Sequence, residues 1–320
     1  MLSRQLALHS PELAVLPEFR LLDLLFVEGE QNINLKTPNE LYEFMLSDYM
    51  IDSLGLCPPQ LQRIAEECQG KGIRYLIEKI VISCASLQGK NPVAVLIQLG
   101  GIRYIKQLLL HFPDSVLIHI FRDARGVVSS MIRTERPYFP GEKMGRDDVV
   151  YAAEYWNNFL RNIDKIRQRK SVMDVRYEDF CRSLNQSVKK IIEALDLHYV
   201  QSGPIEKKFS FQVGERERGI HPLIEKDPVL QRLEAWKEEL THLQGTAIEV
   251  IAEEMLLKKG YNRWFTSDNR PWKKTFFMCL AYADHWLKTI QHCTRKIVQY
   301  AKYKSRFSKR VKAFIVNKSL

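Results

Sequence analysis

The sequence predicts an α/β domain in which helices cover both faces of a parallel sheet, followed by a C-terminal helical extension. Residues 116–121 (VLIHIF) are apolar at nearly every position, as is typical of a parallel strand buried on both faces. Shorter strand-like runs lie at 13–16, 93–97 and 172–175, and helical patterns separate them. Strands that alternate with helices favour a three-layer domain, whose ligands bind at the carboxyl ends of the strands.

The helical patterns between these strands have recognisable boundaries. Thr37-Pro38-Asn39-Glu40 offers a Thr cap, a Pro at the first position and a Glu at the capping-box position. The residues 135–146 are expected to form a loop, 177–179 a turn, and 198–228 an irregular stretch. Further helices are predicted at 61–68, 75–84 and 102–111, after the 116–121 strand as far as 132, and at 147–167, 183–195, 229–240 and 246–258.

The charge of this 320-residue chain is concentrated at its C-terminal end. The net charge is +10, from 48 Lys and Arg against 38 Asp and Glu. Residues 271–320 hold 12 of the basic residues and one acid, Asp284, which leaves 36 basic and 37 acidic residues in 1–270. A near-neutral body argues against a domain built to cover nucleic acid, so no nucleic-acid partner is expected. We expect one α/β domain at 1–270 and a basic helical tail at 271–320.

Membrane-spanning, secreted and metal-binding classes find little support in the sequence. No stretch approaches the ~20 apolar residues that a spanning helix requires, and no signal peptide is recognisable. The six cysteines are scattered without a CxxC pair, so reduced thiols are expected rather than a disulfide framework, and no metal site is expected. These features predict a cytoplasmic protein, with peripheral contact at a membrane surface as an option.

The segment Phe121-Arg122-Asp123-Ala124-Arg125, with Ser130 further on, carries the clearest chemical signal. An Arg leaves the strongest strand and a helix begins within two residues, where backbone N–H groups favour an anion. Arg122 can donate two hydrogen bonds to phosphate oxygens, and Ser130 lies two helical turns on. A local Arg–Asp ion pair and a solvent-facing Ser130 explain the same residues, so both interpretations stay open.

This segment resembles the 3′-phosphate-binding segment of sulfotransferases that use 3′-phosphoadenosine 5′-phosphosulfate (PAPS). The matches are ordered along the chain from about Ala7 to Trp264, and the motif residues are most similar to those of the tyrosylprotein-type and bacterial-type branch. The resemblance implies a P-loop-NTPase-like parallel sheet, PAPS as co-substrate, and no metal. The other matching segments are 101–104, 112–114, Trp156, the turn 175–180, the helix end 195–197, Trp236-Lys237 and Lys259-Gly260-Tyr261.

Residue by residue, the resemblance assigns roles to eight positions. Pro17-Glu18-Phe19-Arg20 is similar to the Glu-x-Arg of that branch, which makes Glu18 the candidate general base with Arg20 beside it. A solvated carboxylate or a salt bridge to Arg20 is the alternative for Glu18. Arg122 and Ser130 become 3′-phosphate ligands and Tyr177 a nucleotide contact. The late-loop residues Arg216, Arg218 and His221 are further nucleotide contacts in a segment where the match is looser.

Two departures from the family pattern qualify this expectation. Family members begin with a strand and a Gly-rich phosphosulfate loop, whereas here residues 3–9 already correspond to the helix that follows that loop. The first strand is therefore expected to be missing, through a truncated gene model or a natural truncation, which would leave unpaired strand edges and cripple catalysis. Gln98 stands where the family often has Lys. A non-catalytic nucleotide-binding or interaction protein of the same fold is the alternative function. A nucleotide kinase is a weaker one, because no GxxxxGK[ST] is present.

The acceptor and the role of the tail stay open at this level. The acceptor is expected to carry a hydroxyl or amine and could be a peptide, glycan, lipid or small molecule. In the tail, apolar residues recur at steps of three and four with Lys and Arg mostly between them, which predicts an amphipathic basic helix. It can pack on the domain, lie on a membrane surface, or attract an acidic acceptor.

Overall fold

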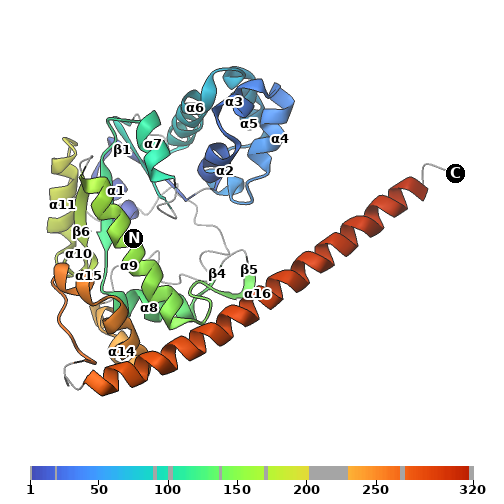
Figure 1. Ribbon diagram of the computed structural model, residues 1–320. Coiled ribbons are helices and arrows are strands. Elements are labelled where there is room, and N and C mark those ends of the chain that lie inside the picture. Colours follow the sequence, from blue (N-terminus) through green and yellow to red (C-terminus); the bar gives the residue numbers. More distant parts are fainter. Residues whose placement is uncertain are drawn as a thin grey trace. The chain divides into compact units, whose positions relative to one another are not determined.

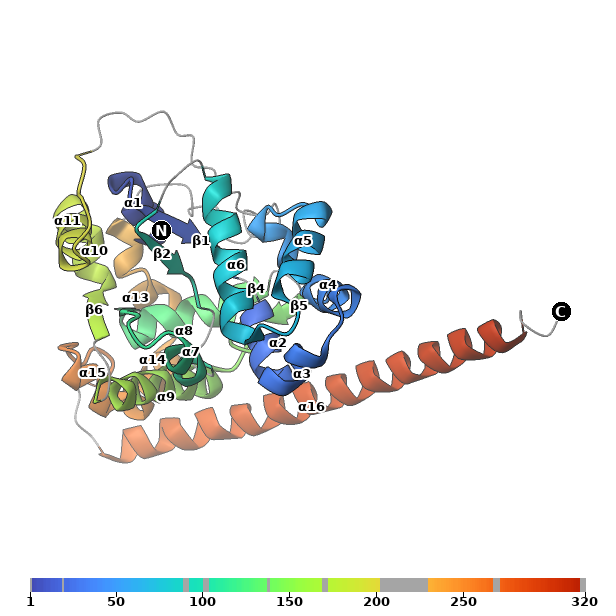
Figure 2. The same ribbon diagram turned by 90° about the horizontal axis from the view of Figure 1, so that it is seen from above.

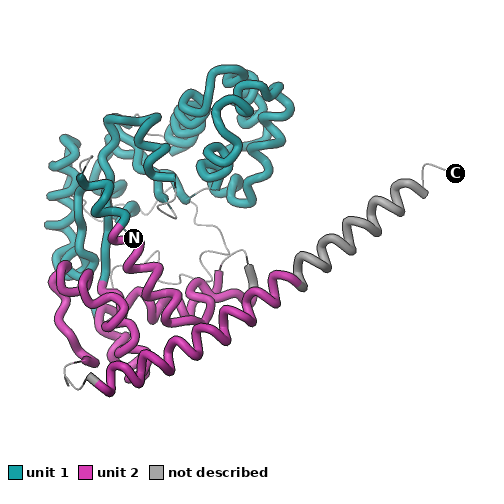
Figure 3. Tube along the Cα trace, in the orientation of Figure 1, with its two compact units in different colours: residues 1–122, 162–230 teal, residues 123–161, 231–320 magenta. Residues whose placement is uncertain are grey.

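The computed structural model describes residues 2–18, 20–88, 92–99, 104–136, 139–168, 172–201, 230–266 and 271–316 (Figure 1, and Figure 2 from above). The chain divides into two compact units (Figure 3): unit 1 consists of residues 1–122 and 162–230, and unit 2 of residues 123–161 and 231–320. The division expected at residue 270 stays a prediction. No helix within the described ranges is long and apolar enough to cross a membrane.

The strands of unit 1 form two parallel pairs. Strand β1 (Leu13–Leu16) pairs with β2 (Ala94–Ile97), and β3 (Leu117–Phe121) pairs with β6 (Val172–Arg176). All four strands lie where the sequence predicts them, to within a residue, and the α/β class with parallel pairing is confirmed. Within the described ranges the two pairs are separate two-stranded sheets, so the single continuous sheet of the sequence prediction is not formed there.

Strand β1 is buried at every position and closed along one edge by a side chain. Helices α1 (Leu2–His9) and α6 (Gly72–Leu87) both pack against it. The side-chain amide of Gln88, just after α6, donates from Nε2 to the Val15 carbonyl (2.7 Å) and accepts the Val15 N–H at Oε1 (3.3 Å). Gln88 thus satisfies a backbone donor and acceptor that a neighbouring strand would otherwise satisfy.

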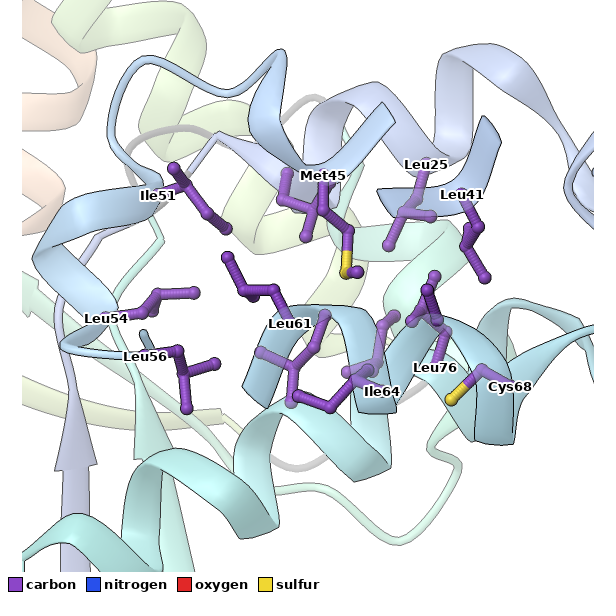
Figure 4. Packing of buried hydrophobic residues seen from close by; sticks show 14 of the residues in the cluster. Leu25, Leu41, Met45, Ile51, Leu54, Leu56, Leu61, Ile64, Cys68 and Leu76 are labelled. Atoms are coloured by element: carbon purple, nitrogen blue, oxygen red, sulfur yellow. The ribbon is translucent and has the colours of Figure 1, made fainter. Parts of the chain in front are cut away.

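The helices between β1 and β2 build their own hydrophobic core (Figure 4). Thr37 and Glu40 form the predicted capping box, with Thr37 N–H donating to Glu40 Oε2 at 2.9 Å. The helices over residues 21–35 were not predicted, because that stretch begins with a nearly continuous apolar run that shows no helical period. This group comprises α2 (Leu21–Glu28), α3 (Glu30–Leu35), α4 (Pro38–Leu46), the 3₁₀ turn η1 (Ile51–Leu54), α5 (Pro58–Cys68) and α6.

The rest of unit 1 follows the sequence prediction with one correction. The expected turn at 177–179 is the first turn of a helix, α10 (Tyr177–Arg182), whose first turn carries two acids that suit a helix N-terminus. The other helices here are α7 (Ile105–His111) and α11 (Leu184–Ala194). His9 at the end of α1 stacks on Tyr199 and accepts the Val200 N–H at its carbonyl (2.8 Å), which ties residues 198–200 to α1.

Unit 2 is mostly helical, and three predictions needed correction there. The expected loop 135–146 contains an antiparallel hairpin, and the expected helix 229–240 is two short helices. The helix predicted at 246–258 begins earlier, at the capping residue Thr241, and is interrupted at Ala252. The elements are α8 (Ala124–Arg133), β4 (Glu135–Arg136), β5 (Phe139–Lys143), α9 (Val149–Arg167, whose last residues fall in unit 1), η2 (Leu230–Leu233), α13 (Trp236–Glu239), α14 (His242–Ile251), α15 (Glu253–Lys258) and α16 (Pro271–Val316).

Gly245 allows the ring of Phe265 to lie directly on α14. A Cβ at position 245 would overlap the atoms of that ring. We expect Gly245→Ala to lower the free energy of unfolding by roughly 1–2 kcal/mol, because overpacking of about 1–3 kcal/mol exceeds the gain in helix propensity. Urea denaturation measures the change. In a Phe265→Leu background the same substitution should have a clearly smaller effect, and an equal effect in both backgrounds would contradict the steric explanation.

Candidate functional site

Arg122 and Tyr177 meet at the carboxyl ends of β3 and β6. Phe121 lies opposite Arg176 in the parallel register, so the next residue of each strand emerges at the same edge. The guanidinium carbon of Arg122 lies 4.9 Å from the centroid of the Tyr177 ring, which is cation–π geometry. The structure therefore brings together two of the residues that the sequence assigned to the nucleotide, at the edge of a parallel pair where ligands bind.

The Tyr177 hydroxyl is held in its neutral form. Burial is the main cause that raises its pKa to about 12, and the neighbouring Cys181 adds to this through charge and a side-chain hydrogen bond, against the opposing effect of Arg122. Burial likewise raises the pKa of the Cys181 thiol. A phenol that stays protonated at neutral pH can donate a hydrogen bond to an anionic oxygen. Tyr177 thus presents its ring face to Arg122, while its hydroxyl forms a hydrogen bond with Cys181.

Asp123, which follows Arg122 in the sequence, accepts hydrogen bonds from Arg125. Asp123 caps α8 by accepting the Arg125 N–H (2.9 Å), and it also accepts from Arg125 Nε (2.9 Å) and Nη2 (2.6 Å). Arg125 Nη1 donates to Glu249 Oε1 at 2.6 Å, and its guanidinium lies 4.1 Å from the Trp236 ring. The local ion pair weighed from the sequence is therefore real, but it uses Arg125 and organises unit 2.

Ser130 lies on α8 in unit 2, while Arg122 closes the first segment of unit 1. The Ser130 side chain is exposed, and the role of Ser130 as a 3′-phosphate ligand stays a prediction. The neighbouring Ser129 is buried and donates to Glu239 Oε2 (2.5 Å), while Arg133 Nη1 donates to Ser129 (3.0 Å). Ser129 is thus engaged in packing α8 against α13, which distinguishes it from Ser130.

Glu18 and Arg20 lie on the connection between β1 and α2. Glu18 follows the strand by two residues and is exposed, and Arg20 is the residue that precedes the first turn of α2. The guanidinium carbon of Arg20 lies 5.4 Å from the centroid of the Tyr49 ring. The connection is anchored by Asp48, which the sequence analysis did not single out: its carboxylate accepts the Leu21 N–H at 2.7 Å.

Asp48 is buried, and its ionisation is correspondingly disfavoured. Burial raises the pKa of this carboxyl, and the backbone hydrogen bonds from Met50, Leu21 and Arg20 oppose that rise only in part. On the neighbouring strand, Gln98 Nε2 donates to the Leu16 carbonyl at 3.4 Å. Gln98 therefore ties the ends of β1 and β2 together.

The remaining assigned residues, Arg216, Arg218 and His221, lie outside the described residues. Just before that stretch, Glu12 Oε2 accepts the His198 N–H at 2.6 Å, so the His-Ser-Pro-Glu segment after α1 holds the residues that lead into it. Across the described part of the chain, no three His, Cys, Asp or Glu side chains gather in a way that could hold a metal ion.

Comparisons with known proteins identify the family and the fold. A family model described as the sulfotransferase family matches residues 27–201, more than half of the chain, a range that includes Arg122, Ser130 and Tyr177 but not Glu18. The sulfotransferase domain from the curacin biosynthetic pathway is similar in structure, with a TM-score of 0.51 and 15% identity over 82% of this chain and 93% of that domain. The sulfotransferase domain from the Synechococcus PCC 7002 olefin synthase gives a TM-score of 0.51 and 17% identity over 82% and 90%. No curated protein matches the sequence. The structural likenesses support the fold.

Proposed function

The chain belongs to the sulfotransferase family, and from that membership we propose that it transfers a sulfuryl group from PAPS to a hydroxyl or amine of an acceptor. The observation that carries the proposal is the contact of Arg122 with Tyr177 where β3 and β6 end. A phosphate bound there meets a permanently charged guanidinium, which can donate paired hydrogen bonds to anionic oxygens. These residues fit the 3′-phosphate end of the donor nucleotide.

In the proposed reaction, the acceptor oxygen or nitrogen forms a bond to sulfur while the bond between sulfur and the bridging phosphate oxygen breaks. The leaving electron pair stays on that oxygen, which gives adenosine 3′,5′-bisphosphate, and the acceptor proton passes to the Glu18 carboxylate. Negative charge spreads over the sulfuryl oxygens in the transition state, as in phosphoryl transfer, so positioning and cations supply most of the catalysis. Arg20, two residues after Glu18, is the proposed cation at the sulfuryl end of the donor.

Arg122→Ala is expected to weaken the binding of adenosine 3′,5′-bisphosphate by roughly 10- to 150-fold, since a hydrogen bond to a charged group contributes about 1.5–3 kcal/mol. Isothermal titration calorimetry measures the affinity directly and needs no acceptor. The affinity of Arg122→Lys should lie between that of the parent and that of Arg122→Ala, because an ammonium keeps the charge but not the paired donors. Arg182→Ala is the matched control: it removes an exposed arginine that pairs with Asp179 at 3.8 Å on α10. Equal affinities for the Arg122 and Arg182 variants would count against the assignment.

A second proposal, a non-catalytic nucleotide-binding protein of the same fold, is favoured by one observation. The pairs β1–β2 and β3–β6 are separate two-stranded sheets within the described ranges, whereas the sequence predicts one parallel sheet. Calorimetry with adenosine 3′,5′-bisphosphate, run beside an assay of its release from PAPS over a panel of phenols, alcohols and amines, separates the two. Binding without release supports the second proposal, and release that depends on the acceptor supports the first.

A further inference from the structure

Helix α16 turns a face with several polar side chains toward the rest of unit 2. Its inward face (Phe277, Ala281, His285, Lys288 and Lys296) recurs at steps of three, four and eight residues, and α16 packs against α14. His285 Nδ1 lies 2.6 Å from Oδ2 of Asp148, whose side chain is buried and whose other oxygen accepts the Tyr151 N–H at 3.0 Å. Lys288 donates to the Asp147 carbonyl (2.5 Å), and Lys296 pairs with Glu142 (2.9 Å). These polar contacts fix the rotation of the helix about its axis.

The opposite side of α16 is apolar and uncovered. An α-helix turns about 100° per residue, which places a second set of side chains on the side away from Ala281 and His285. The exposed fractions there include 64% for Trp272, 65% for Trp286 and 68% for Ile297. A helix packed on a domain for stability normally buries its apolar face, and here the arrangement is reversed. This outward face consists of Trp272, Phe276, Leu280, Trp286, Leu287, Ile290 and Ile297.

The charge of the helix selects what can cover the outward face. Residues 271–320 carry 12 Lys and Arg against Asp284 alone, and seven of the twelve lie in 302–318. A second copy of this helix would bring an equally basic segment alongside, and like charges repel. An anionic lipid surface attracts a basic segment of this kind and accepts Trp and aliphatic side chains at the headgroup boundary.

We propose that α16 binds an anionic membrane surface, with its outward face inserted at the level of the headgroups and the Lys and Arg residues of the basic segment attracting the acidic lipids. The helix lies in the plane of the interface. It holds unit 2 at the membrane through the inward contacts to Asp148 and Glu142. The two parts have separate tasks: the apolar residues supply insertion, and the cations supply the preference for acidic headgroups.

Vesicle co-sedimentation of the full chain tests this, with phosphatidylcholine vesicles compared with phosphatidylcholine–phosphatidylserine vesicles. We expect binding to the mixed vesicles that weakens as salt is raised. The double variant Trp286→Ser, Ile290→Ser should bind roughly tenfold or more weakly, because two apolar side chains no longer leave water. Its matched control, Gln291→Ser with Thr294→Ser, changes two exposed polar positions of the same helix and should bind as the parent does.

A separate variant tests the contribution of the Lys and Arg residues to vesicle binding. Lys309→Gln, Arg310→Gln and Lys312→Gln together should weaken binding to the mixed vesicles by roughly a hundredfold, since each cation near the surface contributes about 1 kcal/mol. All variants change exposed or terminal positions, and circular dichroism melting checks that they fold. The proposal is overturned if the parent chain does not bind the mixed vesicles, or if the Ser double variant binds them as well as the parent does. Sedimentation equilibrium showing a lipid-free dimer that the Ser double variant abolishes would assign the outward face to a second copy.

Discussion

Glu18→Gln should lower kcat for sulfuryl transfer by about 10²–10⁴-fold, the usual contribution of a general base. The substitution keeps the size and polarity of the side chain and removes its charge and its ability to take the acceptor proton. Because Glu18 is exposed just after β1, the change should leave the fold and the Arg122–Tyr177 contact intact. The expected pattern is therefore a loss in kcat with an unchanged affinity for adenosine 3′,5′-bisphosphate. Acceptor-dependent release of that product from PAPS measures the first quantity, and calorimetry the second.

The pH profile distinguishes a base from a merely positioning carboxylate. If Glu18 takes the proton, the acidic limb of the kcat profile reports its ionisation and disappears in the Gln variant. Glu28→Gln is the control, because it removes a carboxylate that pairs with Lys36 at 2.8 Å on the surface of the same unit and should not change kcat. A Glu18 variant with the parent's kcat would refute the assignment, whatever its pH profile.

The contact between Arg122 and Tyr177 could be predicted because it depends on local sequence. Each residue directly follows an apolar strand, and parallel strands present their carboxyl ends at one edge, so the pattern of the strands already places the two side chains together. The same reasoning located Glu18 at the end of β1. It could not place Ser130 relative to Arg122, because that relation depends on how α8 packs and not on the residues that separate the two positions.

Long-range polar contacts were beyond the reach of sequence patterns. Asp123 has an arginine on either side at one and two positions, Arg122 and Arg125, and nothing local decides which of them it binds. The contact with Arg125 is supported by Glu249, 124 positions after Arg125, and by Trp236, whose ring lies against the guanidinium. One signal was present: Glu249 is an acid inside the apolar run of α14, and a buried carboxylate needs a charged partner. Asp48 offered no comparable signal.

Glu249→Ala should destabilise unit 2 by about 3–5 kcal/mol, because it leaves the buried Arg125 guanidinium with one carboxylate fewer. The loss extends beyond the ion pair. Glu249 Oε1 accepts the Trp264 N–H (2.7 Å) and the Phe265 N–H (3.1 Å), and Oε2 accepts from the Thr266 N–H (2.8 Å), so the carboxylate also holds the segment after α15. Thermal and urea unfolding measure the effect. Glu254→Ala, which breaks the exposed pair with Arg161 (3.0 Å), should change stability by no more than about 1 kcal/mol.

The same carboxylate should make stability depend on pH in a defined direction. Burial alone raises the pKa of Glu249, but the hydrogen bonds from Trp264, Thr266 and Phe265 outweigh it and hold the pKa below its ordinary value of 4.5. A carboxyl whose pKa is lowered by folding stabilises the folded state above its unfolded pKa, and this stabilisation is lost as the pH falls through the folded pKa. Glu249→Gln mimics the protonated acid, so the parent should be more stable than this variant near neutral pH and approach it as the solution is acidified. A stability difference that stays constant from neutral to acid pH would show that Glu249 does not supply the acid sensitivity, since protonating the parent would then change nothing that the Gln variant lacks.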